Sequence, residues 1–309
     1  MPLRPPDPSS LGRYRLRGVL GEGGQGVVYL GETPQGRPVA IKVLHVEFND
    51  HVTRARFVRE FEVARRVAAF SIATVIDADV EADRPYIVSE YVPGPSLQQA
   101  VSERGPFSGA ALHRLAVGTA MALASIHATG IVHRDFKPSN ILLGPDGPRV
   151  IDFGIATNQD LATITATGIV GTPAYMAPES MRGERAGPAA DAFAWAGVLL
   201  FAATGSPPFD GASVAEVMYK VLQEEPSRLK ALPEPLYSIA RPCLEKDPIK
   251  RPPMREVLLH LTETPAPDLQ PSISKPDAGV ADPDRTRVHR SNDKRRGWNP
   301  LPNWLRRNR

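Results

Sequence analysis

Short apolar runs separated by glycine and proline open the chain. Between Tyr14 and Leu44, segments rich in Val, Ile, Leu and Tyr are interrupted by a glycine-rich stretch at residues 21–26 and by Thr33-Pro34-Gln35-Gly36. β-branched and aromatic runs that are bounded by turn residues in this way are typical of strands. The pattern therefore predicts a three-stranded antiparallel meander.

A helical pattern follows the meander. Phe57, Phe61 and Ala64 recur at the spacing of one helix face, with arginines at other positions. This periodicity predicts an amphipathic helix within residues 53–69.

Two more strand-like segments, residues 73–80 and 85–91, complete a small antiparallel-sheet lobe over residues 11–92. After Val92-Pro93-Gly94-Pro95 the pattern becomes mostly helical, which predicts a larger helical lobe over residues 93–264. The chain is therefore expected to be α+β and bilobal. Clefts between lobes are common ligand sites.

Both ends of the chain lack a periodic apolar pattern. Residues 265–309 are rich in Pro, Asp, Ser and Arg, and we expect a disordered tail there. The proline-rich residues 1–10 are expected to be a flexible N-terminus, and they contain no apolar segment of the kind found in signal peptides.

Charge and cysteine content narrow the classes of protein. The net charge of the 309 residues is +3, but residues 265–309 contain ten Lys and Arg against five Asp, which is +5 and leaves −2 for the rest. This balance argues against a nucleic-acid-binding body. Cys243 is the single cysteine, so an intrachain disulfide is excluded and a cytoplasmic location is expected.

Two features of the first lobe suggest an anion site. The turn at residues 21–26 joins two strands, where glycine lets backbone N–H groups approach phosphate, although a purely structural turn is an open alternative. Lys42 lies in an otherwise apolar strand, and a buried lysine needs a partner. Glu60, within the apolar stripe of the helix, is the candidate. Alternatively, Lys42 reaches water and Glu60 only flanks the core.

The stretch from His133 to Asn140 places polar residues between two apolar runs. It is followed by Pro145-Asp146-Gly147 and then by Asp152. If a hairpin is centred near residue 146, Asn140 lies opposite Asp152. An amide and a carboxylate at that place suit Mg²⁺. The alternative is that these residues only form turns and satisfy backbone groups.

Several motifs then occur in one order. They are Gly21-Glu22-Gly23-Gly24-Gln25-Gly26, Val39-Ala40-Ile41-Lys42, Glu60, His133-Arg134-Asp135 through Asn140, Asp152-Phe153-Gly154 and Ala177-Pro178-Glu179. Their order resembles the signature set of protein kinases. Lys137 and the segment from Gly171 to Glu179 are most similar to bacterial Hanks-type serine/threonine kinases. The resemblance covers about residues 11–264 and implies the bilobal protein-kinase fold with an ATP cleft.

The resemblance implies a nucleotide site in the cleft. Lys42 would hold the α- and β-phosphates and Glu60 would orient Lys42, while the glycine-rich turn would cover the phosphates. Adenine would lie among apolar side chains and the backbone that joins the lobes. The expected nucleotide-binding residues are Leu20, Gly21, Glu22, Gly23, Gly24, Gln25, Gly26, Val28, Ala40, Lys42, Glu90, Val92 and Leu142.

The resemblance also implies how the γ-phosphoryl group is transferred. Asp135 would accept the hydrogen bond and proton of the substrate hydroxyl, with Lys137 close to the γ-phosphate. Asn140 and Asp152 would bind Mg²⁺, with Mn²⁺ as an alternative. Lys137, two residues after Asp135, is the serine/threonine-kinase arrangement.

Regulation and support are implied for further residues. Arg134 would pair with a phosphothreonine, for which Thr165 and Thr167 are preferred to Thr163. This implies autophosphorylation, with self-association when it occurs in trans. The alternative is a polar loop that merely contains threonines. Three residues are expected to act architecturally: Asp191 below the catalytic loop, and Glu179 paired with Arg251.

Two departures and three alternatives remain. Phe136 replaces the usual leucine, and residues 69–74 lack the His-Pro-Asn type of motif that is common in the family. A pseudokinase or scaffold that binds nucleotide and partners is disfavoured because the catalytic residues are all present. A small-molecule phosphotransferase is disfavoured by Ala177-Pro178-Glu179. The expected partners are protein substrates with Ser or Thr hydroxyls, and the basic tail could touch a membrane or an acidic partner, although a solvated linker is preferred.

Overall fold

The fold is described from a computed structural model of the chain. The structure describes residues 1–24, 26–45, 51–67, 69–153 and 173–263. These residues belong to one compact unit.

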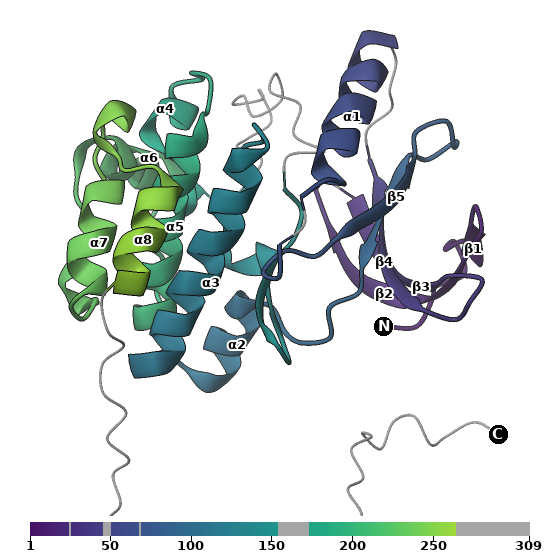
Figure 1. Ribbon diagram of the computed structural model, residues 1–309, viewed down its shortest axis with the longest axis horizontal. Coiled ribbons are helices and arrows are strands. Elements are labelled where there is room, and N and C mark those ends of the chain that lie inside the picture. The colour runs from purple at the N-terminus through teal and green to yellow at the C-terminus, as the bar shows by residue number, and fades with distance from the viewer. Residues whose placement is uncertain (25, 46–50, 68, 154–172, 264–309) are drawn as a thin grey trace, which may run out of the picture. The chain divides into compact units, whose positions relative to one another are not determined.

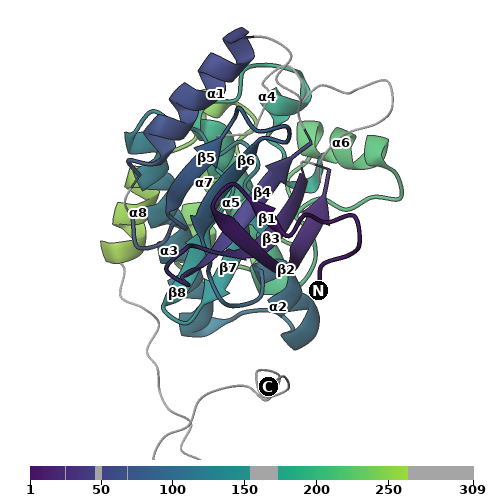
Figure 2. The same cartoon turned by 90° about the vertical axis from the view of Figure 1, so that its right-hand side faces the viewer.

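An antiparallel sheet with one main helix forms the first lobe, the N-lobe (Figure 1). Its strands lie in the order β1-β2-β3-β4-β6-β5. Their bounds are β1 (Ser10–Leu11), β2 (Tyr14–Gly23), β3 (Gly26–Glu32), β4 (Pro38–Leu44), β5 (Val75–Asp79) and β6 (Tyr86–Glu90). Helix α1 (His51–Ala64) packs beside β5 (Figures 1 and 2). The predicted meander, helix and two further strands are therefore confirmed.

The two faces of this sheet belong to different environments. Lys42 in β4 pairs with Val28 in β3 and Ile87 in β6, and Ala40 pairs with Ser89. Because side chains alternate along a strand, Ala40 and Lys42 share one face. The other face carries a separate buried cluster: Tyr14, Leu16, Val19, Tyr29, Val39, Ile41, Val43, Tyr86 and Val88. We call this cluster the outer core.

Residues 1–9, which we expected to be a flexible N-terminus, contact the outer face of the sheet. The carboxylate of Asp7 accepts hydrogen bonds from the backbone N–H of Arg4 at 2.7 Å and from the Tyr29 hydroxyl at 2.8 Å. Leu3 packs against the outer core, and Arg4 pairs with Glu22 at 3.0 Å. The segment has no apolar period, so its sequence pattern could not predict these contacts.

The second lobe, the C-lobe, is helical. Its α-helices are α2 (Leu97–Arg104), α3 (Gly109–Ala128), α4 (Pro178–Met181), α5 (Pro188–Thr204), α6 (Val214–Gln223), α7 (Leu236–Cys243) and α8 (Met254–Glu263). Short 3₁₀ turns are η1 (Pro138–Asn140), η2 (Pro173–Tyr175), η3 (Leu229–Ala231) and η4 (Pro248–Lys250). Helix α5 is buried along nearly its whole length and packs against α3 and α7 (Figure 1). It begins at Pro188, three residues before Asp191, which therefore lies in its first turn.

Helix α3 is long and apolar enough, by length and composition, to cross a membrane. Half of its most apolar window is buried inside the protein, and Leu123 and Ile126 are completely buried. Since it also packs against α5 and α8, α3 serves as a core helix of the C-lobe.

A short hairpin lies between the lobes. Strands β7 (Ile141–Gly144) and β8 (Gly147–Val150) pair through a two-residue turn, with Ile141 opposite Val150. Continuing this register places Asn140 opposite Ile151, whose N–H donates to the Asn140 carbonyl at 3.0 Å. Our expectation that Asn140 lies opposite Asp152 was therefore wrong by one residue, because the turn is Pro145-Asp146 and not a loop centred on residue 146.

The packing of α3 against α5 gives a first test. We expect Leu123→Ala to lower the free energy of unfolding by about 3 kcal/mol, because it leaves a cavity in a fully buried site. Urea denaturation measures this change. Leu259→Ala on α8 is the matched control, since Leu259 is 57% exposed and its loss should cost under about 0.5 kcal/mol. Equal effects of the two substitutions would contradict the packing described.

The contacts of Asp7 give a second test, in its pH dependence. Hydrogen bonds from Arg4 and Tyr29 lower the pKa of Asp7 below its ordinary 3.8. A lowered pKa stabilises the folded state above the ordinary value, and this stabilisation is lost as the pH falls through the folded pKa. The stability difference between wild type and Asp7→Asn should therefore be largest near neutral pH and shrink below pH 3.8 in urea titrations. Asp83→Asn, at an exposed position, is the control, and a pH-independent difference for Asp7→Asn would refute the assignment.

Candidate active site

The buried carboxylate of Asp191 holds the loop that carries Asp135. Asp191 is 1% exposed and lies in the first turn of α5, where a helix favours negative charge. It accepts hydrogen bonds from the backbone N–H groups of His133 at 2.7 Å and Arg134 at 2.9 Å, and its Oδ2 lies 2.7 Å from His127 Nε2. Arg134 has a left-handed backbone, with φ of 66°. The two N–H contacts therefore fix a conformation that a non-glycine residue disfavours.

His133 ties this loop to the strand end that carries Asp152. Its ring is fully buried, with Nε2 3.1 Å from the Ile151 carbonyl and Nδ1 3.4 Å from the backbone nitrogen of Asp135. A carbonyl only accepts and a backbone N–H only donates, so the proton is assigned to Nε2. Phe136, the departure from leucine, is buried with its ring edge-on to His133 at 5.4 Å. The larger side chain thus fits the loop.

Asp135 lies within a small polar cluster. Lys137 Nζ is 2.8 Å from Asp135 Oδ2. Asn140 Nδ2 donates to the Asp135 carbonyl at 2.8 Å and to Oδ2 at 3.3 Å. One carboxylate oxygen of Asp135 is therefore engaged by both neighbours, and the Asn140 amide is oriented through its nitrogen.

Lys42 and Asp152 come together across the lobes. Lys42 is 9% exposed, and its Nζ lies 3.0 Å from Asp152 Oδ2. Asp152 has φ of 59°, a left-handed conformation that aspartate tolerates better than most residues. Glu60 lies half-buried on α1, and its expected pairing with Lys42 stays a prediction. A cavity of about 40 Å³ adjoins the ion pair and is lined by Lys42, Ala73, Val75, Ile87, Ser89, Ile151, Asp152 and Phe153.

The donor set near Asp152 suits a hard cation. The Asn140 side-chain nitrogen donates to Asp135, so the amide oxygen is the atom left for a metal. The backbone carbonyl of Asn140 accepts the N–H of Ile151, the residue directly before Asp152. Among the residues that the structure describes, three or more His, Cys, Asp or Glu side chains nowhere gather at a metal-binding distance. A cation here would rest on two protein oxygens and complete its shell with phosphate and water, as Mg²⁺ does.

The expected nucleotide residues that the structure describes lie on or next to β2, β3, β4, β6 and β7, and of these Lys42 lines the 40 Å³ cavity. The glycine-rich turn joins β2 to β3, and a Cβ on Gly26 would lie 1.9 Å from the Val43 carbonyl, so only glycine fits. Leu20 is 44% exposed, an unusual exposure for a large apolar side chain on a strand. Val28, Ala40 and Leu142 are half-buried on β3, β4 and β7, and Glu90 and Val92 lie at and beyond the end of β6.

Several predicted residues lie outside the described part of the chain. These are Gln25, Thr163, Thr165, Thr167, the Gly171-Thr172 pair and the basic tail. Their expected roles stay predictions.

The expected pair of Glu179 and Arg251 is present and buried. Arg251 Nη1 and Nη2 donate to the two Glu179 oxygens at 2.7 and 2.8 Å. Arg251 also donates to the carbonyls of Ala189 at 2.9 Å and Glu245 at 2.6 Å. This bidentate pair joins the start of α4 to the segment before α8.

Sequence reasoning missed Lys246, which lies next to this pair. Its Nζ donates to the Val221 carbonyl at 2.6 Å and lies over the stacked rings of Phe193 and Phe209. Burial, and then the nearby Arg251 charge, lower the pKa of Lys246 to about 8. A lysine amid polar residues gives no sequence signal for such a site.

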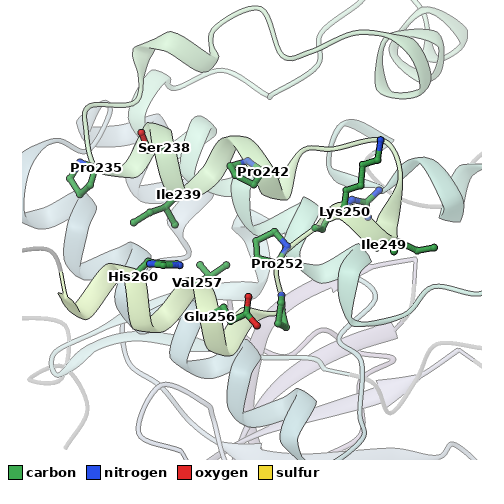
Figure 3. Close-up of a pocket in the computed structure, with 12 residues that line it drawn as sticks. Pro235, Ser238, Ile239, Pro242, Ile249, Lys250, Pro252, Glu256, Val257 and His260 are labelled. Carbon is green, nitrogen blue, oxygen red and sulfur yellow. The ribbon is translucent and has the colours of Figure 1, made fainter.

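A second hollow lies in the C-lobe, between α7 and α8 (Figure 3). It has a volume of about 660 Å³, and its lining is largely proline and aliphatic, as Pro235, Pro242, Pro252, Ile239 and Val257 show. Within the described residues, its lining shares none of the predicted nucleotide, catalytic or metal residues, so the candidate active site lies elsewhere.

Comparison with known proteins agrees with this geometry. A family model described as the protein kinase domain matches residues 14–261. The probable serine/threonine-protein kinase PkwA of Thermomonospora curvata is 49% identical over 263 residues, covering 84% of this chain and 35% of PkwA. Serine/threonine-protein kinase AfsK of Streptomyces coelicolor is 46% identical over 249 residues, covering 80% of this chain and 31% of AfsK. The chain thus spans about a third of the length of these curated relatives.

Among solved structures, the crystal structure of Rad53 1–466 in complex with AMP-PNP is similar, with a TM-score of 0.68 and 24% identity. The match covers 80% of this chain and 64% of that chain. The fold predicted from the motifs is confirmed.

The buried ion pair gives a third test. We expect Glu179→Gln to lower the free energy of unfolding by about 3 kcal/mol, because the Arg251 charge then stays buried without its counter-charge. Chemical denaturation measures this loss. Glu225→Gln is the matched control, because its 3.6 Å pair with Arg241 is exposed and should matter little. If Glu179→Gln were as stable as Glu225→Gln, the pair would have no supporting role.

Proposed function

Because this chain belongs to the protein kinase family, we propose that it transfers the γ-phosphoryl group of ATP to serine and threonine hydroxyls of proteins. The family uses ATP with a divalent metal and acts on protein substrates. The observation that carries the proposal is a set of polar contacts. Lys137 and Asn140 both contact Asp135 on the loop that Asp191 holds, and Lys42 pairs with Asp152.

Asp135 is proposed to accept the proton of the substrate hydroxyl. Lys137 and Asn140 both engage Oδ2, which leaves Oδ1 for the hydroxyl. Holding a carboxylate in one orientation before the substrate arrives is the main contribution that positioning makes to phosphoryl transfer. Lys137 then lies where it would neutralise charge on the γ-phosphate.

Lys42 is proposed to hold the α- and β-phosphates, with Glu60 orienting it from α1. The glycine-rich turn supports this role, because Gly26 brings the backbone of β3 close to β4 at a point where a side chain would collide. Asn140 and Asp152 would hold Mg²⁺, which would neutralise phosphate charge when bound. Apolar Leu20, the half-buried positions on neighbouring strands and the backbone at residues 90–92 would bind adenine.

A catalytically weak scaffold is less well supported. Lys42, Asp135, Asn140 and Asp152 are all present, and each makes a specific polar contact. A small-molecule phosphotransferase is also less well supported, because the buried Arg251 anchors the Ala177-Pro178-Glu179 segment of a protein-substrate platform.

Regulation by autophosphorylation is part of the proposal. Arg134 directly precedes Asp135. A phosphothreonine that pairs with the Arg134 guanidinium would therefore lie next to the catalytic carboxylate. Thr165 and Thr167 are the preferred acceptors, and self-association would allow transfer in trans. We include the phosphorylation of other proteins, as physiological substrates, in the same proposal.

Phosphate incorporation from γ-labelled ATP with Mg²⁺ tests the function. Wild-type protein should label itself, with Thr165 or Thr167 identified by mass spectrometry, and should label a generic protein substrate. Asp135→Asn should reduce the rate at least about 100-fold, because the proton acceptor is lost. Asp146→Asn, in the exposed hairpin turn, is the matched control and should stay active. Nucleotide binding without any labelling by wild type would instead favour the scaffold.

A further inference from the structure

The side chain of Arg149 joins three segments that are distant in sequence. It lies on β8 and is only 15% exposed. Nη1 donates to the Ile72 carbonyl at 3.3 Å and lies 3.7 Å from Glu90 Oε2. The guanidinium also lies over the Phe70 ring, 4.8 Å from its centre. Such a combination of stacking, hydrogen bonding and charge is specific to arginine.

The first segment that Arg149 contacts connects α1 to β5. This connection, residues 69–74, is the one that lacks the usual family motif. Its backbone is tied to β8, since Val150 donates to the Ser71 carbonyl at 2.8 Å and accepts from Ala73 at 3.0 Å. Arg149 adds a side-chain tie at the neighbouring position of β8. The connection is thus held to the hairpin by backbone hydrogen bonds and by the Arg149 side chain.

The second segment is the backbone that joins the lobes. Glu90 ends β6, and its carboxylate Oε2 accepts the N–H of Thr74 at 3.3 Å while facing Arg149. Further along, Gly94 lies so close to the hairpin that a Cβ would be 2.2 Å from the Leu143 carbonyl. Residues 90–94 therefore follow the hairpin closely.

Arg149 also shares a rung of the hairpin with a residue of the proposed adenine site. It is the cross-strand partner of Leu142. Directly opposed residues in an antiparallel pair lie about 5 Å apart, so a shift of one moves the other. This cross-strand pair thus contains Leu142, which is expected to contact adenine, and Arg149, whose guanidinium faces Glu90.

We propose that Arg149 is a positioning residue that fixes residues 90–92 relative to Leu142 and thereby sets the affinity for nucleotide. The proposal rests on the proposed function, because it assumes that adenine binds between these segments. Arg149 acts through Glu90 and the 69–74 connection and contacts neither the phosphates nor Asp135. Its loss should therefore weaken nucleotide binding without slowing the chemical step.

Calorimetric titration with ADP and steady-state kinetics on Arg149→Gln test the proposal. We expect the Kd for ADP and the KM for ATP to rise about threefold to tenfold, with kcat at saturating ATP within about twofold of wild type. Arg149→Lys, which keeps the charge but cannot stack in the same way, should lie between the two. Arg114→Gln, at an exposed position of α3, is the matched control and should bind ADP as wild type does.

Glu90→Gln provides a second route if Arg149→Gln does not fold. This change keeps an oxygen for the Thr74 N–H but removes the charge that faces Arg149, so it should shift the Kd in the same direction. The double variant should be no weaker than Arg149→Gln alone, because both changes break one interaction. Unchanged Kd and KM, or a fall in kcat alone, would overturn the role of Arg149 while leaving the kinase proposal intact. Wild-type protein that binds no ADP would instead overturn both.

Discussion

The candidate site depends on one buried carboxylate. An isolated charge in the interior is costly, so Asp191 must be satisfied by donors, and the loop before Asp135 supplies two backbone N–H groups for this purpose. Those contacts hold Arg134 in its left-handed conformation and leave the His133 ring where it binds Ile151. Since Asp152 directly follows Ile151, both acidic residues of the proposed chemistry derive their positions from Asp191.

Helix α5 extends this support through the C-lobe. Its first turn carries Asp191, and its next turn places Phe193 beneath Arg251 and Lys246. Trp195 donates to the Thr119 hydroxyl at 3.0 Å and so connects α5 with α3. The loop that carries Asp135, the pair of Glu179 and Arg251, and the packing of α3 against α5 therefore all depend on α5. A change in any one of them would disturb this helix.

The sequence predicts most elements because their patterns are local. Short apolar runs bounded by turn residues give the strands from Tyr14 to Leu44, and helical spacing gives α1. The hairpin register was missed by one residue, because it depends on whether a turn contains two residues or three. The contacts of Asp7, Lys246 and Arg149 were also missed. Each of them joins segments that are distant in sequence, and no periodic pattern of apolar and polar residues relates those segments. Resemblance, rather than pattern, identified the pairing of Glu179 with Arg251.

The separation of the outer core from the larger core has a thermodynamic consequence. A small cluster that is packed on one face of a sheet can open locally at a lower free energy than the whole molecule. Opening it would loosen the strands that contribute to it, β2, β3, β4 and β6, while the loop that carries Asp135 stayed folded. A ligand bound between the glycine-rich turn and the hairpin would therefore stabilise the N-lobe against this local opening. Its binding free energy would be measured as slower hydrogen exchange in these strands.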